Sequence, residues 1–517
     1  MALYNGKIMK RKTNLMFSCL GMIAAATGCS RENINIPPDI ILILADDLGI
    51  GDISCYNPEG KISTPNIDRL AEKGVSFVDA HSTSALSTPS RYSVMTGRYP
   101  WRTTLKQGVL GGFADPLIDE DRSTLADVLS DAGYETACIG KWHLGWNWGH
   151  DSEGKVDFTL PITDGPTERG FDYFFGISAS LDMAPFIFIE NDNATEAETR
   201  IFDKDTGVHL FHGGIGGKSF KPEECLPELT RRAVDHIAEW KGSDEPHFLY
   251  LPLTAPHTPC LPSEEFKGVT GLGDYGDFVV MVDDVVGQIV EAVRKTGRLK
   301  NTVFVFSSDN GCAPYADTKA LETAGHFPSI DYRGYKSDIF EGGHRIPLII
   351  SGKGIDRKGA VCDEIATLAD LFATFQAMAG INSDGKSAED SFNLLPSING
   401  GTSSGRDFII TASGKGALAI RDRQYKLIFT PGSGGWSFPT KPADLAGLPE
   451  RQFYDMLNDP SETLNLIDLP EFQEKILELT GYIRTAVLDG RTAPGEQASN
   501  DTASDWKQVL PIFKTHN

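Results

Sequence analysis

Basic residues are scarce in this sequence of 517 residues. Lys and Arg number 48 against 71 Asp and Glu, which gives a formal net charge of -23 at pH 7. Nucleic acids and anionic membrane surfaces bind proteins through an excess of positive charge on one face, so the composition argues against either as a partner. If the substrate is an anion, a metal ion or a local cluster of cations must hold it.

The sequence also lacks internal repeats and closely spaced cysteines. No Cys-x-x-Cys motif occurs, so neither a zinc site nor a redox pair is indicated. We expect most of the cysteines to be buried free thiols, although an oxidising compartment would permit a disulfide or two. The six cysteines beyond the amino-terminal segment are Cys55, Cys138, Cys225, Cys260, Cys312 and Cys362.

The amino-terminal segment has the pattern of an export signal. Basic residues between positions 7 and 12 precede an apolar run over 15–26, which is too short to span a bilayer but suits a secretory signal peptide over 1–28. Residues 26–29 (Ala-Thr-Gly-Cys) resemble a bacterial lipobox, in which Cys29 would be lipidated; an ordinary cleaved signal is the alternative. We expect a protein of the periplasm, or an outer-membrane lipoprotein of a Gram-negative bacterium, with membrane contact only through such an anchor.

Three apolar runs predict strands that are buried on both faces of a sheet. They cover 40–45, 247–253 and 302–307, and each runs directly into polar residues. Helical patterns lie between them, over 66–73, over 124–131 after a Ser123 cap, and over 278–294. Alternating strands and helices predict an α/β fold with a large, mostly parallel sheet sandwiched by helices. Ligands bind such sheets at the carboxyl ends of the strands, where the polar residues lie.

The pattern changes after residue 398. Residues 399–405 (Asn-Gly-Gly-Thr-Ser-Ser-Gly) have the composition of a linker, and shorter strand-like runs and one helix over 470–488 follow. We therefore predict an amino-terminal α/β domain over 36–398. A carboxy-terminal α+β subdomain over 406–517, with a small antiparallel sheet and a packed helix, would wall one side of the pocket.

One segment carries a specific motif. Residues 87–97 read Ser-Thr-Pro-Ser-Arg-Tyr-Ser-Val-Met-Thr-Gly. Further motifs follow in order: Gly-Lys-Trp-His at 140–143, Ala-Pro-His at 255–257, Ser-Asp-Asn-Gly at 308–311 and Arg-Gly-Tyr-Lys at 333–336. On these residues the chain resembles the formylglycine-dependent sulfatases of the alkaline phosphatase superfamily, which implies an alkaline phosphatase-like fold.

The resemblance implies a modified nucleophile. An unmodified serine needs an adjacent base, and no Gly-x-Ser-x-Gly motif surrounds Ser87. In the sulfatases that this chain resembles, the residue at the position of Ser87 is oxidised to formylglycine (3-oxoalanine). For Ser87 we expect this oxidation to be carried out by a serine-type anaerobic sulfatase-maturating enzyme. The hydrated aldehyde would attack sulfur through one hydroxyl and expel sulfate through the other.

A metal ion is expected for a physical reason as well. A transferring sulfuryl group carries negative charge on its oxygens, and a hard cation with oxygen ligands stabilises that charge. The resemblance assigns Asp46, Asp47, Ser87, Asp309 and Asn310 to one Ca²⁺ ion. Asp309 would also accept a proton as the diol attacks.

The remaining site residues take their roles from the same resemblance. Arg91 would stabilise the hydrated aldehyde, because a guanidinium stays protonated. Lys141 and Lys336 would contact sulfate oxygens, and His143 would take the proton of the second hydroxyl. His257 would protonate the leaving alcohol.

We therefore expect a sulfuric ester hydrolase acting on sulfated saccharides of host or dietary origin, as an exo-acting glycan O-sulfatase. One alternative is a phosphatase or phosphodiesterase of the same superfamily, which would use two zinc ions and more histidines than the 11 present. Another is a non-catalytic glycan-binding lipoprotein. Trp142, Trp146 and Trp148 fit either a sugar platform or the core.

Overall fold

The computed structural model describes residues 37–401, 403–501 and 506–514. From Pro37 onward the chain forms one compact unit. The expected signal peptide over 1–28 and Cys29 lie outside the described residues, and the domain boundaries at 398 and 406 stay predictions. No helix in the described ranges has both the length and the apolar character of a transmembrane span.

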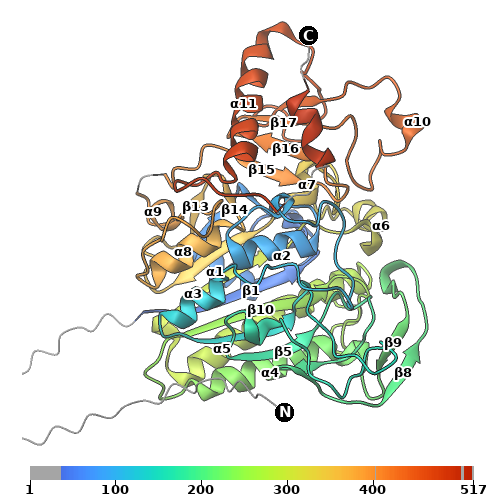
Figure 1. Cartoon of the computed structure of the whole chain (residues 1–517), viewed down its shortest axis with the longest axis vertical. Helices are drawn as coiled ribbons and strands as arrows, with labels where there is room; N and C mark the ends of the chain where they lie inside the picture. Colours follow the sequence, from blue (N-terminus) through green and yellow to red (C-terminus); the bar gives the residue numbers. More distant parts are fainter. Residues whose placement is uncertain (1–36, 402, 502–505, 515–517) are drawn as a thin grey trace, which may run out of the picture. The chain divides into compact units, whose positions relative to one another are not determined.

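A large mixed sheet forms the centre of the fold (Figure 1). Ten strands of the described chain pair in the order β13-β2-β12-β11-β1-β10-β4-β5-β6-β7. The five neighbours β11, β1, β10, β4 and β5 run parallel, and β12 pairs antiparallel with β11 and β2. The strands are β1 (Asp39–Asp46), β2 (Gly74–Phe77), β4 (Glu135–Lys141), β5 (Tyr173–Ile177), β6 (Ile189–Glu190), β7 (Asn193–Ala194), β10 (His247–Pro256), β11 (Thr302–Ser308), β12 (Leu348–Gly352) and β13 (Ala360–Cys362). The predicted mostly parallel sheet is confirmed.

Strand β1 supplies side chains to both faces because successive residues of a strand point to opposite sides. Ile41 and Ile43 belong to one apolar core, whereas Ile40, Leu42 and Leu44 belong to the other. A strand that must bury both faces reads as a continuous apolar run, which is why this segment could be identified in the sequence.

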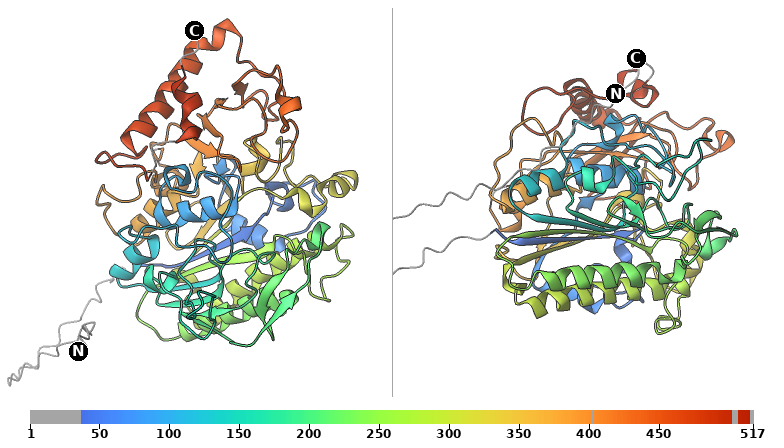
Figure 2. Two further views of the ribbon diagram at one scale, coloured as in Figure 1. Left: turned by 45° about the vertical axis from the view of Figure 1, so that its right-hand side comes forward. Right: turned by 60° about the horizontal axis from the view of Figure 1, so that its bottom comes forward.

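Helices cover both faces of the sheet. The first core contains α1 (Pro65–Glu72), α4 (Cys225–Glu239) and α5 (Asp274–Thr296). Helices α4 and α5 pack against each other, and the right-hand view of Figure 2 shows them below the sheet. The second core contains α2 (Ser87–Thr96), α3 (Leu125–Asp131) and α8 (Asp370–Met378). The cap of α3 is Thr124 rather than Ser123, because the Thr124 side chain accepts a hydrogen bond from the Asp127 amide.

The described chain also contains shorter strands and α-helices outside the carboxy-terminal sheet. They are β3 (Ala80–His81), β8 (Thr199–Phe202), β9 (Gly214–Gly217), β14 (Ala366–Thr367), α6 (Thr318–Thr323), α7 (Glu341–His344), α9 (Leu395–Ile398), α10 (Pro442–Leu445) and α12 (Leu510–Phe513).

The carboxy-terminal region forms the predicted small antiparallel sheet. Its order is β15 (Ile409–Ala412), β16 (Leu418–Arg421), β17 (Tyr425–Ile428) and β18 (Gln452–Asp455). Helix α11 (Gln473–Asp489) packs on one face, and the other face contacts Ile339 and Phe340 (Figure 1). The Ala412 amide donates to the Thr83 carbonyl and the Ala85 amide to the Ala412 carbonyl, so this sheet holds the chain immediately before Ser87.

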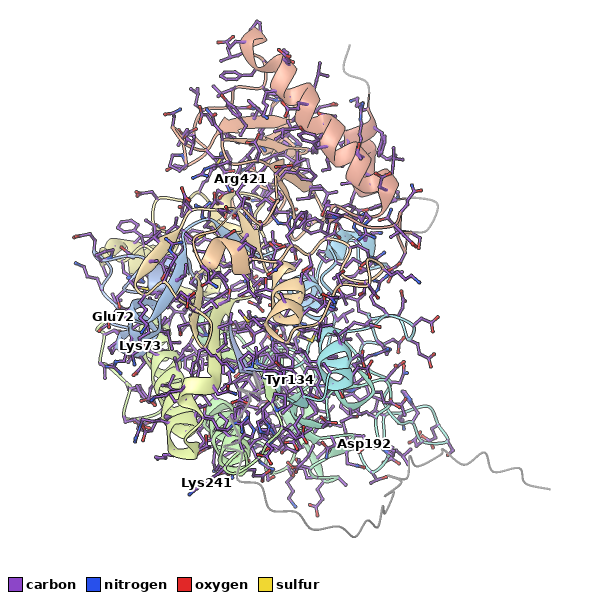
Figure 3. All side chains as sticks on the ribbon, turned by 90° about the vertical axis from the view of Figure 1, so that its left-hand side faces the viewer. Glu72, Lys73, Tyr134, Asp192, Lys241 and Arg421 are labelled. Atoms are coloured by element: carbon purple, nitrogen blue, oxygen red, sulfur yellow. The ribbon has the colours of Figure 1, made fainter. Side chains whose placement is uncertain are left out.

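Buried ion pairs join the small sheet to the rest of the unit. Arg421 of β16, labelled in Figure 3, places Nη1 2.6 Å from Asp79 Oδ1. Lys426 of β17 places Nζ 3.1 Å from Glu341 Oε1 and 2.8 Å from Glu462 Oε1. Breaking a buried pair leaves an uncompensated charge, so these contacts fix the position of the small sheet.

The structure answers two expectations, one about the cysteines and one about three tryptophans. The six described cysteines are free thiols, and all except Cys55 are buried. Trp142, Trp146 and Trp148 are buried in the second core, so they are packing residues and not a sugar platform.

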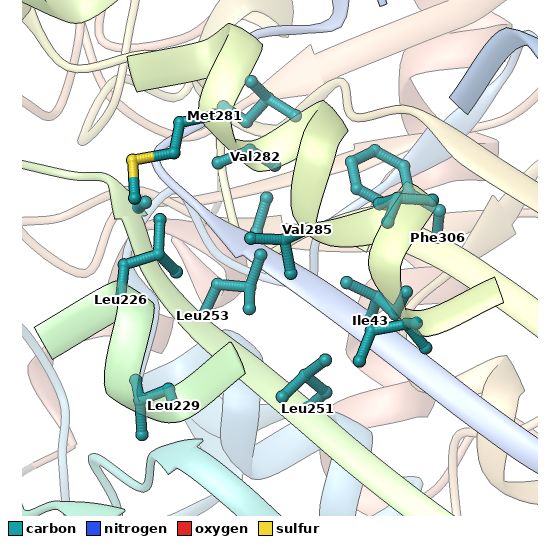
Figure 4. Close-up of a cluster of buried hydrophobic side chains, with 14 of the residues drawn as sticks. Ile43, Leu226, Leu229, Leu251, Leu253, Met281, Val282, Val285 and Phe306 are labelled. Atoms are coloured by element: carbon teal, nitrogen blue, oxygen red, sulfur yellow. The ribbon is translucent and has the colours of Figure 1, made fainter. Parts of the chain in front are cut away.

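Leu251 provides a test of the first core. Its side chain is fully buried beside Ile43, Leu229 and Val285 (Figure 4). We expect Leu251→Ala to lower the free energy of unfolding by about 2–5 kcal/mol, because lost burial and a cavity both contribute. Denaturant unfolding measures this.

Leu477→Ala on α11 is the matched control, since that leucine is 70% exposed. Its expected change is within about 0.5 kcal/mol. Equal effects of the two substitutions would contradict the described packing.

Candidate active site

The polar residues that follow the central strands meet at one edge of the sheet. Asp46 ends β1, Lys141 ends β4, and Asp309 directly follows β11. The Asp309 amide donates to the Ala45 carbonyl at 3.1 Å, which places the two strand ends side by side. Parallel pairing therefore gathers residues that are far apart in the sequence.

Three buried carboxylates at this edge are each paired with a buried cation. Lys141 Nζ lies 2.7 Å from Asp46 Oδ2, and Lys336 Nζ lies 2.7 Å from Asp47 Oδ2. Arg91 Nη2 lies 2.8 Å from Asp309 Oδ2 and 3.5 Å from Asp46 Oδ1. The six charged side chains that the sequence motifs predicted to act together thus lie side by side.

The pairing shifts the protonation equilibria of the site. Burial raises the pKa of Asp46, but Lys141, His257 and Arg91 outweigh it and hold the pKa at about 2. Burial lowers the pKa of Lys336, yet Asp47 and Asp46 raise it above its ordinary value. These groups are therefore charged at neutral pH.

Helix α2 carries the predicted nucleophile at its first residue. Ser87 Oγ lies 3.3 Å from Asp46 Oδ1 and 3.4 Å from Asn310 Oδ1. Arg91 follows one helical turn later, so both side chains point to the same side of α2. The helix amino terminus adds partial positive charge beside residue 87, which favours a bound anion.

Two site residues have strained backbones. Asp47 has φ 62° and His143 has φ 58°, in the left-handed region that non-glycine residues seldom adopt. Such conformations cost about 1–3 kcal/mol each and cluster at functional sites. Asp47 directly follows β1 and His143 comes two residues after β4, where the turn directs each side chain into the site.

The hydrogen bonds of His143 determine which of its nitrogens can act as a base. Nε2 lies 2.8 Å from the Leu110 carbonyl oxygen and must donate to it. Nδ1 is buried and has no hydrogen-bond partner within the described residues. Burial, Lys141 and Arg91 lower the pKa of His143 well below its ordinary value. The neutral ring thus keeps a lone pair on Nδ1.

His257 and Lys336 are held in position by backbone contacts. His257 Nδ1 is bonded to the Thr258 carbonyl, which leaves Nε2 3.5 Å from Asp47 Oδ2. The Lys336 amide donates to the Cys312 carbonyl at 2.8 Å, and the Ser337 amide donates to the Ala85 carbonyl at 2.7 Å. The segment carrying Lys336 is therefore tied both to the turn after β11 and to the chain before Ser87.

The donor set fits a hard divalent cation. Asp46, Asp47 and Asp309 offer carboxylate oxygens, and Asn310 offers an amide oxygen that faces Ser87. Ligand atoms of Asp46, Asp47 and His257 also lie within 4.8 Å of one another. A hard cation prefers oxygen ligands, so these carboxylate and amide oxygens suit such an ion better than the His257 nitrogen does.

A second buried group, His81, Glu341 and His344, also brings ligand atoms together. It has one carboxylate, and Lys426 Nζ and Arg345 Nη1 lie 3.1 and 2.9 Å from that carboxylate's oxygens. A further cation would meet an already neutralised site. We assign this group to the junction with the small sheet.

The candidate active site lies in a pocket of about 220 Å³. Its lining includes Ser87, His143, His257 and Lys336. Several other lining residues were missed in the sequence: Asp182, His212, Tyr315, Lys415 and Trp436. Only the glycine-rich context of Trp436 (Gly-Ser-Gly-Gly-Trp) marked an irregular loop. The other residues lie in loops without a repeating pattern.

Comparison with known proteins assigns the family. A sequence model described as sulfatase matches residues 38–381. The chain belongs to the sulfatase family. It is therefore a sulfuric ester hydrolase, and the alternatives of a phosphatase and of a non-catalytic binding protein fall away.

Relatives of this sulfatase match almost their whole length. It is 34% identical over 510 residues to N-acetylgalactosamine-6-O-sulfatase of Bacteroides thetaiotaomicron, covering 90% of this chain and 97% of that one. Human arylsulfatase A is 31% identical, with 86% of each chain covered. A solved structure from a study of glycosaminoglycan metabolism by Bacteroides thetaiotaomicron superposes with a TM-score of 0.78 at 33% identity, over 87% of this chain and 99% of that one.

Arg91→Met tests the charge pairing of this sulfatase. The substitution leaves the buried carboxylates of Asp309 and Asp46 without their guanidinium partner, so we expect the free energy of unfolding in metal-free buffer to fall by about 3–5 kcal/mol. Thermal or denaturant unfolding measures the loss.

Arg231→Met removes an exposed arginine that pairs with Glu228 and Asp235. Its expected effect is within about 1 kcal/mol, because surface pairs contribute little. A loss at Arg91 no larger than this control would show that the buried cluster does not stabilise the fold.

Proposed function

We propose that this sulfatase is an exported enzyme that hydrolyses sulfate esters of carbohydrates. The observation that carries the proposal is that Asp46 and Asn310 face the Ser87 hydroxyl, with Asp47 hydrogen-bonded to Asp309 and Asn310 beside them. Ser87 lines a pocket together with His143, His257 and Lys336. The export pattern of residues 1–28 and the lipobox-like Cys29 support a location in the periplasm or at the outer membrane.

The first substrate to test is a 6-O-sulfated N-acetylgalactosamine unit. Relatives at 34% and 31% identity carry that specificity in their names. Ser87, His257 and Lys336 are buried while other lining residues of the pocket are exposed, so one end of the pocket is closed, which supports exo action on a terminal unit.

The proposed nucleophile is residue 87 after oxidation of the serine by a serine-type sulfatase-maturating enzyme. The hydrated aldehyde supplies two hydroxyls, one to attack sulfur and one to expel sulfate as the aldehyde re-forms. The surrounding chain suits this role, because the Arg91 guanidinium lies on the same side of α2 and the helix amino terminus adds partial positive charge beside residue 87.

Asp46, Asp47, Asp309, Asn310 and residue 87 would hold one Ca²⁺, which would supply positive charge for the sulfate oxygens. The negative charges of the three carboxylates are balanced by the positive charges of Lys141, Lys336 and Arg91, so the cluster is close to neutral before an ion binds. A divalent ion makes it net positive, which an anionic ester needs on a protein of net charge -23.

Each proton transfer in the proposed reaction is assigned to one side chain of the protein. His143 Nδ1, neutral and without a partner among the described residues, accepts the proton of the second hydroxyl. His257 donates through Nε2 to the leaving oxygen, with Lys336 beside it on Asp47. Arg91 remains protonated and holds Asp309, which takes the proton released as the diol attacks.

Ser87→Ala is expected to abolish sulfate release from 6-O-sulfated N-acetylgalactosamine, because no neighbouring hydroxyl replaces the oxidised residue. In wild-type protein made with the maturating enzyme, the peptide containing residue 87 should be lighter by two hydrogens. Ion chromatography of sulfate and mass spectrometry of the peptide measure the two quantities.

Wild-type protein made without the maturating enzyme is the control. It should fold with an unchanged unfolding midpoint and should release no sulfate. Turnover by this protein or by Ser87→Ala would defeat the modified-nucleophile mechanism.

Calcium should stabilise the folded state. At a concentration about 100 times its dissociation constant, a ligand specific for the native protein adds about 2.7 kcal/mol. We expect Ca²⁺ to raise the thermal midpoint and a chelator to reverse the shift. Asn310→Ala should reduce the shift because an oxygen ligand is lost, whereas Asn458→Ala, in an exposed turn, should retain it. Equal shifts in both variants, or none in the wild type, would place the ion elsewhere or remove it.

A further inference from the structure

A groove between helices α1 and α5 lies at the edge of the sheet opposite the active site. Helix α1 ends at Glu72, directly before β2, and α5 ends at Thr296, shortly before β11. The groove therefore lies where β2 and β11 begin, whereas Asp46 and Asp309 lie where β1 and β11 end. Its cavity has a volume of about 570 Å³, and no step of the proposed reaction uses it.

The two helices are held together at Asn66. Asp283 Oδ1 of α5 accepts hydrogen bonds from the Asn66 and Ile67 amides at 3.0 and 2.8 Å. One turn further along α5, a Cβ at Gly287 would lie 2.8 Å from Asn66 Cγ, so the helices are in contact there. Beyond this contact, the space between the carboxy-terminal halves of α1 and α5 forms the groove.

The floor of the groove is apolar. Leu70 of α1 and Phe304 of β11 are buried, and the half-buried side chains of Val290 and Leu299 line the cavity beside them. A sugar ring presents C–H groups on its faces and carries its hydroxyl, carboxylate or sulfate groups at its edge. Burial of apolar area against such faces favours binding. The floor thus suits a ring whose polar groups point to the rim.

Positive charge surrounds this floor. Among the described residues that line the groove, six are basic and one, Glu291, is acidic, on a protein of net charge -23. A local excess of one sign attracts ligands of the opposite sign, whatever the overall charge. The groove therefore attracts anions. Its basic residues are Arg69, Lys73, Arg294, Lys300, Lys353 and Lys358.

Three of these lysines are available to a ligand. Lys73, labelled in Figure 3, Lys300 and Lys358 are exposed, and within the described ranges none of the three forms an ion pair with a carboxylate. Lysine at the end of a helix offsets the partial negative charge of the last turn, which accounts for Lys73 after α1. Lys300 and Lys358 belong to no α-helix, so that account does not extend to them.

The shape and the charge of the groove together indicate the class of ligand. A membrane surface is flat, whereas these cations surround a cavity with a buried floor, so a ligand must enter the cavity to contact that floor. A single phosphate carries a charge of about -2 at most, which would leave most of the cations unmatched. A chain of sugar rings with an anionic group on successive units satisfies both conditions.

We propose that the groove between α1 and α5 is a second glycan-binding site, separate from the active site, which binds a sulfated polysaccharide chain. The apolar floor packs against sugar rings, and Lys73, Lys300 and Lys358 bind sulfates or carboxylates along the chain. The inference rests on the proposed function, because the ligand is the polymer that carries the substrate. An enzyme held on that polymer meets chain ends at a raised effective concentration.

Binding to chondroitin 6-sulfate, a chain that contains 6-O-sulfated N-acetylgalactosamine, tests the site without turnover. The groove variant combines Lys73→Gln, Lys300→Gln and Lys358→Gln. On protein made without the maturating enzyme, calorimetry should show that this variant binds the chain about tenfold more weakly than the wild type. Added salt should weaken binding less steeply in the variant, because fewer cations contact the chain.

The matched control combines Lys241→Gln, Lys319→Gln and Lys441→Gln, three exposed lysines outside the groove. It removes the same net charge and should bind the chain as the wild type does. Equal losses in the two triple variants overturn the site, since overall charge would then explain the binding. An unchanged affinity in the groove variant also overturns it. So does tighter binding of double-stranded DNA or of anionic phospholipid vesicles with the same loss in the groove variant, which would assign the groove to another partner.

Activity separates this site from the proposed function. In matured protein, the groove variant should lower kcat/KM for chondroitin 6-sulfate by up to about tenfold and leave kcat/KM for the single sulfated sugar unchanged. An equal loss on both substrates would overturn the site. Absence of sulfate release from either substrate by matured wild-type protein would contradict the proposed function, while weaker chain binding by the groove variant would still support the site. Unchanged thermal midpoints verify that both triple variants fold.

Discussion

The mutual neutralisation of three buried carboxylates and three buried cations is the constraint on which the rest of this structure depends. Asp46, Asp47 and Asp309 pair with Lys141, Lys336 and Arg91, and all six side chains are buried. Each buried charge costs several kcal/mol in lost hydration unless its partner is present. Strands β1, β4 and β11, helix α2 and the segment around Lys336 must therefore close on one another, so the groups that would bind sulfate also hold the central elements together.

Chemistry and substrate contacts come from different parts of the chain. The ends of β1, β4 and β11 supply the three carboxylates and Lys141, where parallel pairing fixes positions closely, and helix α2 and the segment around Lys336 supply the other two cations. The loop at Trp436 and the residue Lys415 come from the carboxy-terminal sheet, which is joined by the Asp79–Arg421 and Glu341–Lys426 pairs and by hydrogen bonds at Ala412. A change in that loop would alter which sugar is accepted and leave the catalytic charges in place, in keeping with specificity carried by loops on a shared fold.

The sequence by itself predicted the fold class and the three central strands of the large sheet. The apolar runs at 40–45, 247–253 and 302–307 became β1, β10 and β11, because a strand buried on both faces has no polar residue to interrupt it. The other strands of the large sheet, β12 and β2 among them, were not predicted, since short strands lack a distinctive period. The α3 cap moved from Ser123 to Thr124, because either hydroxyl residue suits the position and only the backbone geometry selects one.

For the site, the motifs in the sequence determined which residues would act together, from Asp46 to Lys336. Their geometry was decided by tertiary structure alone: the tautomer of His143 depends on the Leu110 carbonyl, and Lys415 and Trp436 reach the pocket from the carboxy-terminal region. Trp142, Trp146 and Trp148 became core while Trp436 stayed exposed, although all are the same residue type. Burial depends on which distant segments pack against a side chain, and the local sequence does not encode that.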